Sequence, residues 1–137
     1  MTVARACLCL VIIISGLLLR RFGLGLEMPA AIVKYGGSIL WGAMVFFLVA
    51  LVTPRLSRLR TASVSAVIAV GVELFRLVHT PWLDGFRSTL AGALLLGRIF
   101  SAWNILAYGA GILSALALDC LAERFLSRRL PAPYSPS

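Results

Sequence analysis

Residues 71–100, GVELFRLVHTPWLDGFRSTLAGALLLGRIF, set ionisable side chains into a sequence that is otherwise suited to hydrocarbon. Glu73 lies near the centre of an apolar run, and Arg76 follows it three residues later. A charged side chain at the centre of a membrane helix costs about 2.5 to 3.5 kcal/mol on insertion scales, so Glu73 requires a partner or a function. The stretch therefore predicts a polar cluster inside an apolar protein.

The composition of the whole chain points to lipid as its solvent. Of the 137 residues, 61% are hydrophobic and 13% are charged, and the mean hydropathy is +0.99. A water-soluble fold of this composition would expose large apolar patches, which soluble monomers rarely do. Since helices satisfy their own backbone hydrogen bonds in lipid, we expect an all-α integral membrane helix bundle, made of one domain.

The net charge of +8 does not indicate a nucleic-acid partner. The basic residues stand in pairs and triplets between apolar runs, where the positive-inside rule places them. An orientation with the N-terminus inside leaves seven arginines in the cytoplasm and five basic residues outside, with Arg76 in the membrane. We therefore expect a bacterial inner-membrane protein with both termini in the cytoplasm. The seven are Arg5, Arg55, Arg58, Arg60, Arg124, Arg128 and Arg129, and the five are Arg20, Arg21, Lys34, Arg87 and Arg98.

Four apolar runs are long enough to predict transmembrane helices at residues 3–19, 36–52, 62–79 and 101–121, within a domain of residues 1–126. The first run could instead be a secretory signal peptide, but no small-x-small cleavage site follows it, which favours an uncleaved helix. Residues 85–96 are too short for a full span and predict a re-entrant or interfacial helix capped by Asp84; a full crossing there would move the C-terminus outside. Residues 127–137 predict a disordered tail.

Two predicted helices carry stripes that should face other helices rather than lipid. In the third span the stripe consists of Ser65, Ala69, Glu73, Arg76 and Thr80. In the fourth span it consists of Ser101, Asn104, Tyr108, Gly111, Ala115 and Asp119. Ala107, Gly111 and Ala115 also place small residues at a spacing of four, which predicts close packing of that helix on a neighbour.

No metal, cofactor or disulfide is expected. The three cysteines, Cys7, Cys9 and Cys120, lie in apolar runs, and Cys7 and Cys9 point to opposite sides of a helix. The single histidine, His79, lacks the neighbouring cysteines or histidines that a zinc site needs.

The polar cluster has two interpretations. It could bind a small polar ligand or a lipid head group, because arginine forks suit carboxylate and phosphate. Alternatively, Glu73 and Arg76 form an internal ion pair in a structural or regulatory bundle, and the small-residue face joins protomers into a homo-oligomer. An enzyme or transporter is less supported, since no nucleophile with a neighbouring base and no internal repeat is recognisable. The candidate cluster residues are Glu73, Arg76, His79, Asp84, Arg87, Thr89, Asn104 and Tyr108.

The sequence also resembles a known family. The segments KYGGSILWGAMVFF, PRLS, ELFRLVHTPWLDGFRSTLAGALLLGRIF and NILAYGAGIL, within residues 35–111, are similar to the bacterial domain-of-unknown-function family numbered 2809. That family consists of small multi-spanning membrane proteins without an assigned activity. A looser similarity to the VanZ-like membrane family points to the cell envelope. The resemblance to family 2809 places on matching positions Glu73, His79, Pro81, Trp82, Leu83, Asp84, Arg87, Thr89, Gly97, Ala107 and Tyr108.

Three polar positions depart from the pattern that this resemblance implies. Ser38 and Asn104 stand where the family usually has aspartate, and Arg76 stands where it usually has glutamine. Two acids are lost and one base is gained. Any proton or cation chemistry shared by the family is therefore in doubt for this chain, although Arg76 could instead neutralise Glu73 directly.

Overall fold

The structure, a computed structural model, describes residues 1–89, 92 and 100–129. These residues form five helices and no strand, which confirms an all-helical fold. The helices are α1 (Thr2–Phe22), α2 (Ala30–Val52), α3 (Arg58–Phe75), α4 (Pro81–Ser88) and α6 (Ala102–Arg129).

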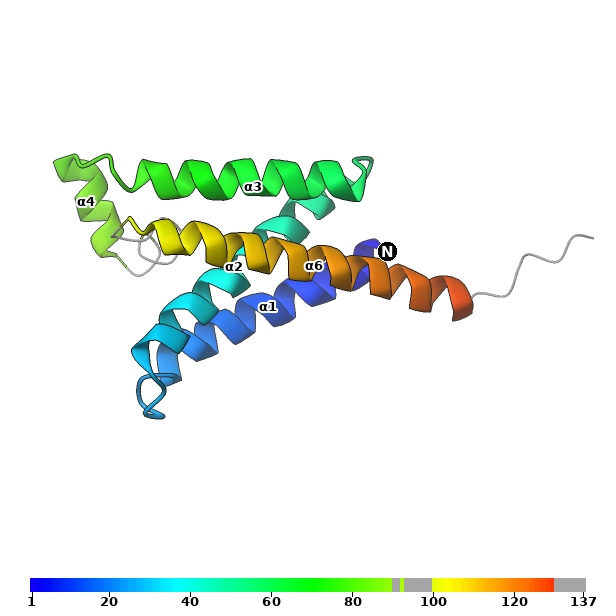
Figure 1. The fold of residues 1–137 in the computed structure, drawn as a ribbon, viewed down its shortest axis with the longest axis horizontal. Coiled ribbons are helices and arrows are strands. Elements are labelled where there is room, and N and C mark those ends of the chain that lie inside the picture. The colour runs from blue at the N-terminus through cyan, green and yellow to red at the C-terminus, as the bar shows by residue number, and fades with distance from the viewer. Residues whose placement is uncertain (90–91, 93–99, 130–137) are drawn as a thin grey trace, which may run out of the picture.

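The four longer helices run up and down the length of the molecule (Figure 1). The start of α1, the end of α2, the start of α3 and the end of α6 lie at one end, which we call the basic end. The turn between α1 and α2, the end of α3, α4 and the start of α6 lie at the opposite end, which we call the α4 end. Helix α2 is central, because it packs against α1, α3 and α6.

In the described part of the chain, three helices and not four are long and apolar enough to cross a membrane: α1, α2 and α6. The expectation that residues 62–79 form a fourth helix of this apolar kind is wrong. Helix α3 begins earlier, at Arg58, where the Ser57 hydroxyl accepts a hydrogen bond from the Arg60 N–H. It ends at Phe75, so its 18 residues include Arg58, Arg60 and Glu73, too many charges for a simple span.

The expectation that Asp84 caps the next segment is also wrong. The cap of α4 is Thr80, whose hydroxyl accepts from the Leu83 N–H, and Pro81 occupies the first helical position, which suits its missing N–H. Asp84 lies in the first turn instead. Half of the predicted helix at residues 85–96, namely residues 90, 91 and 93–96, together with Gly97 and Arg98, lies outside the described residues. Helix α6 continues to Arg129, and the predicted tail beyond it is likewise not described.

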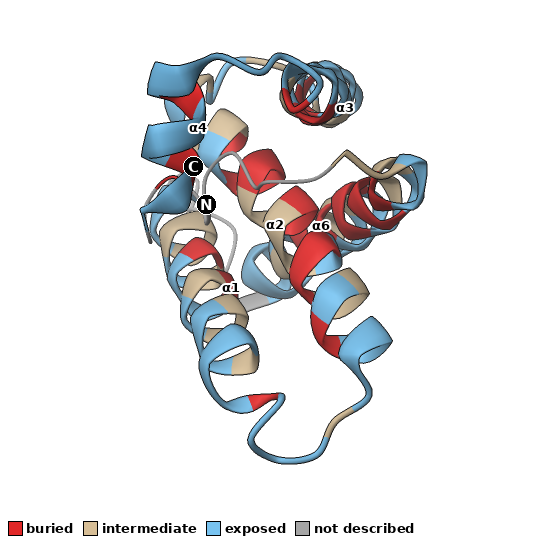
Figure 2. Ribbon diagram, turned by 90° about the vertical axis from the view of Figure 1, so that its left-hand side faces the viewer, coloured by how far each residue is buried: buried red, intermediate tan, exposed pale blue. Residues whose placement is uncertain are grey.

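The buried residues line the inner faces of α2, α3 and α6 (Figure 2). Both predicted stripes are confirmed: Ser65, Ala69, Glu73 and Arg76 are buried on the α3 side, as are Asn104, Tyr108, Gly111, Ala115 and Asp119 on α6. Thr80 and Ser101 are the exceptions. Thr80 is exposed because it lies beyond the end of α3, and Ser101, which precedes α6, is half-buried.

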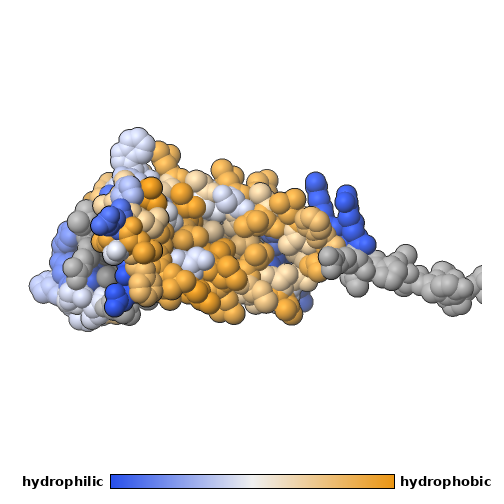
Figure 3. Space-filling view, turned by 90° about the horizontal axis from the view of Figure 1, so that it is seen from below, coloured by the Kyte–Doolittle hydropathy of each residue, from blue (hydrophilic) through white to orange (hydrophobic). Residues whose placement is uncertain are grey.

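The outer surface is apolar. Large side chains on it include Leu10, Val11, Leu48 and Leu113, all exposed. Figure 3 shows a broad apolar band between hydrophilic ends on the face that it draws. A band of this kind suits the hydrocarbon of a bilayer, so the surface agrees with three helices that could span a membrane.

Glycines let α2 and α6 approach closely. A Cβ on Gly111 would lie 2.0 Å from the Ile39 carbonyl oxygen, and a Cβ on Gly42 would lie 2.5 Å from the Tyr108 carbonyl oxygen. The predicted close packing of the small-residue face is thus confirmed, and its partner is α2. Because α2 covers this face, the idea that it joins protomers is not supported by the structure.

Replacing Gly111 with alanine should separate α2 from α6 and lower the free energy of unfolding by about 1–3 kcal/mol, the usual cost of overpacking. Gly109→Ala is the matched control, since a Cβ there meets nothing within 4 Å. It should be neutral or slightly stabilising. Thermal unfolding of both variants in detergent micelles measures the difference, and equal midpoints would contradict the close contact.

Candidate functional site

The carboxylate of Glu73 is fully buried and accepts hydrogen bonds from four donors. Its Oε1 accepts from the Ser101 backbone N–H at 2.7 Å and from the Asn104 amide at 3.2 Å. Its Oε2 accepts from the Tyr108 hydroxyl at 2.9 Å and lies 2.6 Å from Nη1 of Arg76. A carboxylate offers about four lone-pair sites, so this group is fully satisfied.

Helix α2 contributes Ser38 to this arrangement. We call the whole set of six residues the Glu73 cluster: Ser38, Glu73, Arg76, Ser101, Asn104 and Tyr108. The Ser38 hydroxyl lies 3.3 Å from Oδ1 of Asn104 and 3.2 Å from the Lys34 carbonyl oxygen, and it can donate to one of them at a time. The Trp41 ring packs against the Tyr108 ring with centroids 4.9 Å apart. The cluster therefore connects α2, α3 and α6.

Charge in the Glu73 cluster is balanced by one cation. Arg76 directly follows α3, is 8% exposed, and pairs with Glu73 three residues earlier. Its guanidinium also lies over the Tyr108 ring, 6.0 Å from the centroid. An unpaired carboxylate at this depth would be very costly, so this pairing lets Glu73 remain buried.

The structure divides the eight predicted site residues into two groups. Glu73, Arg76, Asn104 and Tyr108 meet in the Glu73 cluster. The other four, His79, Asp84, Arg87 and Thr89, lie on or beside α4 and do not take part in the contacts of Glu73 described above. The described contacts therefore form two polar groups rather than one cluster of all eight residues.

Arg87 serves as a cap for α3. Its Nη2 donates to the Phe75 carbonyl and its Nη1 to the Val78 carbonyl, each at 2.7 Å, and the side chain is 3% exposed. A cation suits these terminal carbonyls because the C-terminal end of a helix carries partial negative charge. Asp84 lies 3.3 Å from the same Nη1 and 3.2 Å from Nδ1 of His79. These contacts satisfy carbonyls at and just beyond the C-terminal end of α3.

The remaining predicted residue, Thr89, has a local role. Its hydroxyl donates to the Phe86 carbonyl at 2.7 Å and accepts from the Gly92 N–H at 3.1 Å. This is turn chemistry at the end of α4, where a threonine hydroxyl satisfies backbone groups that the helix leaves open.

The three positions at which the chain departs from the family resemblance lie in one chain of contacts. Ser38 lies against Asn104, Asn104 donates to Glu73, and Glu73 pairs with Arg76. Aspartates at positions 38 and 104 would bring three acids together around this point. Because the residues touch, loss of the two acids and gain of Arg76 act on the same electrostatic balance.

A second buried carboxylate, Asp119, lies at the basic end, and sequence reasoning did not include it among the site residues. Its Oδ1 is 2.7 Å from Nε of Arg5, and its Oδ2 is 2.8 Å from Nε of Arg58. Arg58 also pairs with Glu123. A hydrogen bond to Asp119 and, to a smaller extent, one to Glu123 raise the pKa of the Arg58 guanidinium, so this group stays charged. One sequence feature could have identified Asp119: it is the single acid in the apolar run 101–121, and it lies on the same stripe as Tyr108.

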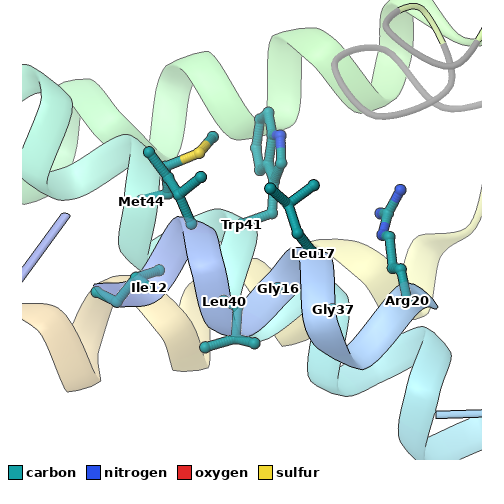
Figure 4. Close-up of a pocket in the computed structure, with 9 residues that line it drawn as sticks. Ile12, Gly16, Leu17, Arg20, Gly37, Leu40, Trp41 and Met44 are labelled. Carbon is teal, nitrogen blue, oxygen red and sulfur yellow. The ribbon is translucent and has the colours of Figure 1, made fainter. Parts of the chain in front are cut away.

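An apolar groove lies between α1 and α2 (Figure 4). Its volume is about 190 Å³. No sequence feature indicated this groove, because it arises from the way in which two apolar helices cross. Its lining residues are Ile12, Ile13, Gly16, Leu17, Arg20, Gly37, Leu40, Trp41 and Met44.

Comparison with known families gives one match. The model of a family described as protein of unknown function (DUF2809) matches residues 28–112, well over half of the chain. The matched part contains α2, α3, α4 and the start of α6, and with them the whole Glu73 cluster. No solved structure matches the chain.

The Asp119 contacts predict a stability effect that exposed acids do not share. Asp119→Asn removes the charge between Arg5 and Arg58 and should lower the free energy of unfolding by about 1–3 kcal/mol, since a buried acceptor is weakened while both arginines keep some access to water. Glu123→Gln, at a half-exposed side chain, should change it by about 0–1 kcal/mol. Denaturant unfolding in micelles compares the two, and equal effects would refute the assignment.

Proposed function

We propose that this chain, which belongs to the family of proteins of unknown function DUF2809, is a non-enzymatic integral membrane protein whose Glu73 cluster holds its helices in register. The observation that carries this proposal is the saturation of the Glu73 carboxylate by four donors from its own chain. The cluster therefore acts as a structural lock within a bundle of structural or regulatory role.

The geometry supports a lock better than a binding pocket. A cationic ligand at Glu73 would have to displace Arg76, and an anionic ligand at Arg76 would have to displace Glu73. In either case a buried charge loses a hydrogen-bonded partner, which typically costs several kcal/mol. A catalytic role meets the same obstacle, because Glu73 cannot accept a proton from a substrate without releasing one of its donors.

We place the protein in a bacterial inner membrane with both termini in the cytoplasm, an orientation in which α3 runs beside α2 and α6 from the basic end to the α4 end and returns the chain to the outer side. Arg5, Arg55, Arg58 and Arg60 lie at the basic end, together with the end of α6. The positive-inside rule favours the cytoplasm for such an end. This arrangement also puts the short loop between α1 and α2, which contains Glu27, on the outer side.

A double-mutant cycle tests the lock. Glu73→Gln alone should lower the free energy of unfolding by about 3 kcal/mol or more, because Arg76 then lacks its countercharge. Glu73→Gln with Arg76→Gln should recover at least about 1 kcal/mol of that loss through positive coupling of the two residues. Glu27→Gln, in the exposed loop after α1, is the control and should be neutral.

Native mass spectrometry of protein released from nanodiscs separates the lock from the rival, a site for a small polar ligand or lipid head group. If the Glu73 cluster is a lock, the Glu73→Gln and Glu27→Gln variants should carry the same bound masses. A discrete adduct lost in both Glu73 variants, with no coupling in the cycle, would replace the lock with a binding site. Reversing the pair is a weaker test, since an arginine at position 73 would also meet the Ser101, Asn104 and Tyr108 donors.

A further inference from the structure

The groove between α1 and α2 has the shape of a channel for one narrow apolar group. Ile12 and Arg20 mark its two ends on α1 and are eight residues apart, which corresponds to about 12 Å along a helix. Its volume of about 190 Å³ is too small for a helix, whose diameter with side chains is about 10 Å. Leu17, Leu40, Trp41 and Met44 make its walls apolar, so water would find few polar partners there.

One end of the groove carries an available cation. The Arg20 guanidinium lies beside Gly37, where its Nε would be 3.5 Å from an added Cβ, and the residue is exposed. Across the described residues, Arg20 forms no hydrogen bond or ion pair, in contrast to Arg5, Arg58, Arg76 and Arg87. It therefore has donors to offer to an anion.

The position of Arg20 relative to the bilayer matches a head group. Arg20 immediately follows the apolar run of α1, at the α4 end, with Arg21 beside it and Lys34 at the start of α2. From this level the groove extends about 12 Å inward, and one leaflet of the hydrocarbon core is about 15 Å thick. This region contains three basic residues, Arg20, Arg21 and Lys34, and one acidic residue, Glu27.

We propose that this groove is a binding site for one anionic phospholipid, with an acyl chain between α1 and α2 and the phosphate on Arg20. The guanidinium fork pairs with phosphate oxygens, while the apolar walls take the chain. Trp41 forms part of the wall and packs on Tyr108, so the bound chain also supports the ring that donates to Glu73.

Native mass spectrometry in mixed micelles tests the site, with phosphatidylglycerol and phosphatidylethanolamine of identical acyl chains at equal concentration. The wild-type protein should retain one lipid and prefer phosphatidylglycerol by about fivefold, the factor typical of one basic residue at a membrane surface. Arg20→Gln should abolish the preference. Arg21→Gln is the matched control, because it removes the same charge from the next residue, which does not line the groove, and it should keep the preference.

A second pair of variants tests the acyl channel. Leu17→Trp fills the groove and should lower retention of both lipids several-fold, whereas Leu18→Trp, outside the groove, should not. Equal effects of Arg20→Gln and Arg21→Gln would show general surface attraction and overturn the proposal. The proposal would also be overturned if the wild-type protein retained no lipid. It would likewise be overturned if the protein formed a dimer that Leu17→Trp disrupts, because a second copy of the chain would then occupy the groove.

Discussion

The buried charge of Glu73 constrains the architecture more than any other group in the molecule. A carboxylate without contact to water must receive its hydrogen bonds from the protein, and here the donors come from the backbone before α6, from two side chains of α6 and from Arg76. These donors converge only if α3 and α6 lie side by side with a fixed register. Burial of this charge therefore specifies the helix arrangement, in addition to any stability that it contributes.

Helix α6 packs closely through its backbone on the side that faces α2, and it makes ionic contacts on the sides that face α3 and α1. Towards α2, Gly111 and Gly42 bring the backbones together, and dispersion contacts hold them. Towards α3 and α1, the contacts are ionic, with Glu73 at the start of α6 and Asp119 in its second half. Since lipid provides little hydrophobic drive for helix association, such polar contacts decide which helices are neighbours.

Periodicity and the cost of buried charge were enough to predict the helical class, the inner faces of α3 and α6, and four of the six residues of the Glu73 cluster. They could not show where α3 ends. The carbonyls at that end are capped by Arg87, which reaches back from α4 to Phe75 and Val78, a contact between elements that periodicity does not reveal. The groove beside Arg20 was equally out of reach, because a gap between two apolar helices depends on how they cross and not on which residues they carry.

The ion pairs of Asp119 also bear on the order in which the molecule is assembled. Arg5 and Asp119 are 114 positions apart in the chain. During synthesis Arg5 emerges before α2 and α3, while its partner Asp119 emerges only after α1, α2 and α3 are complete. Helix α1 must therefore enter the membrane before Arg5 has its partner, even though α1 already packs on α2. Closure of the basic end thus requires that most of α6 has been made.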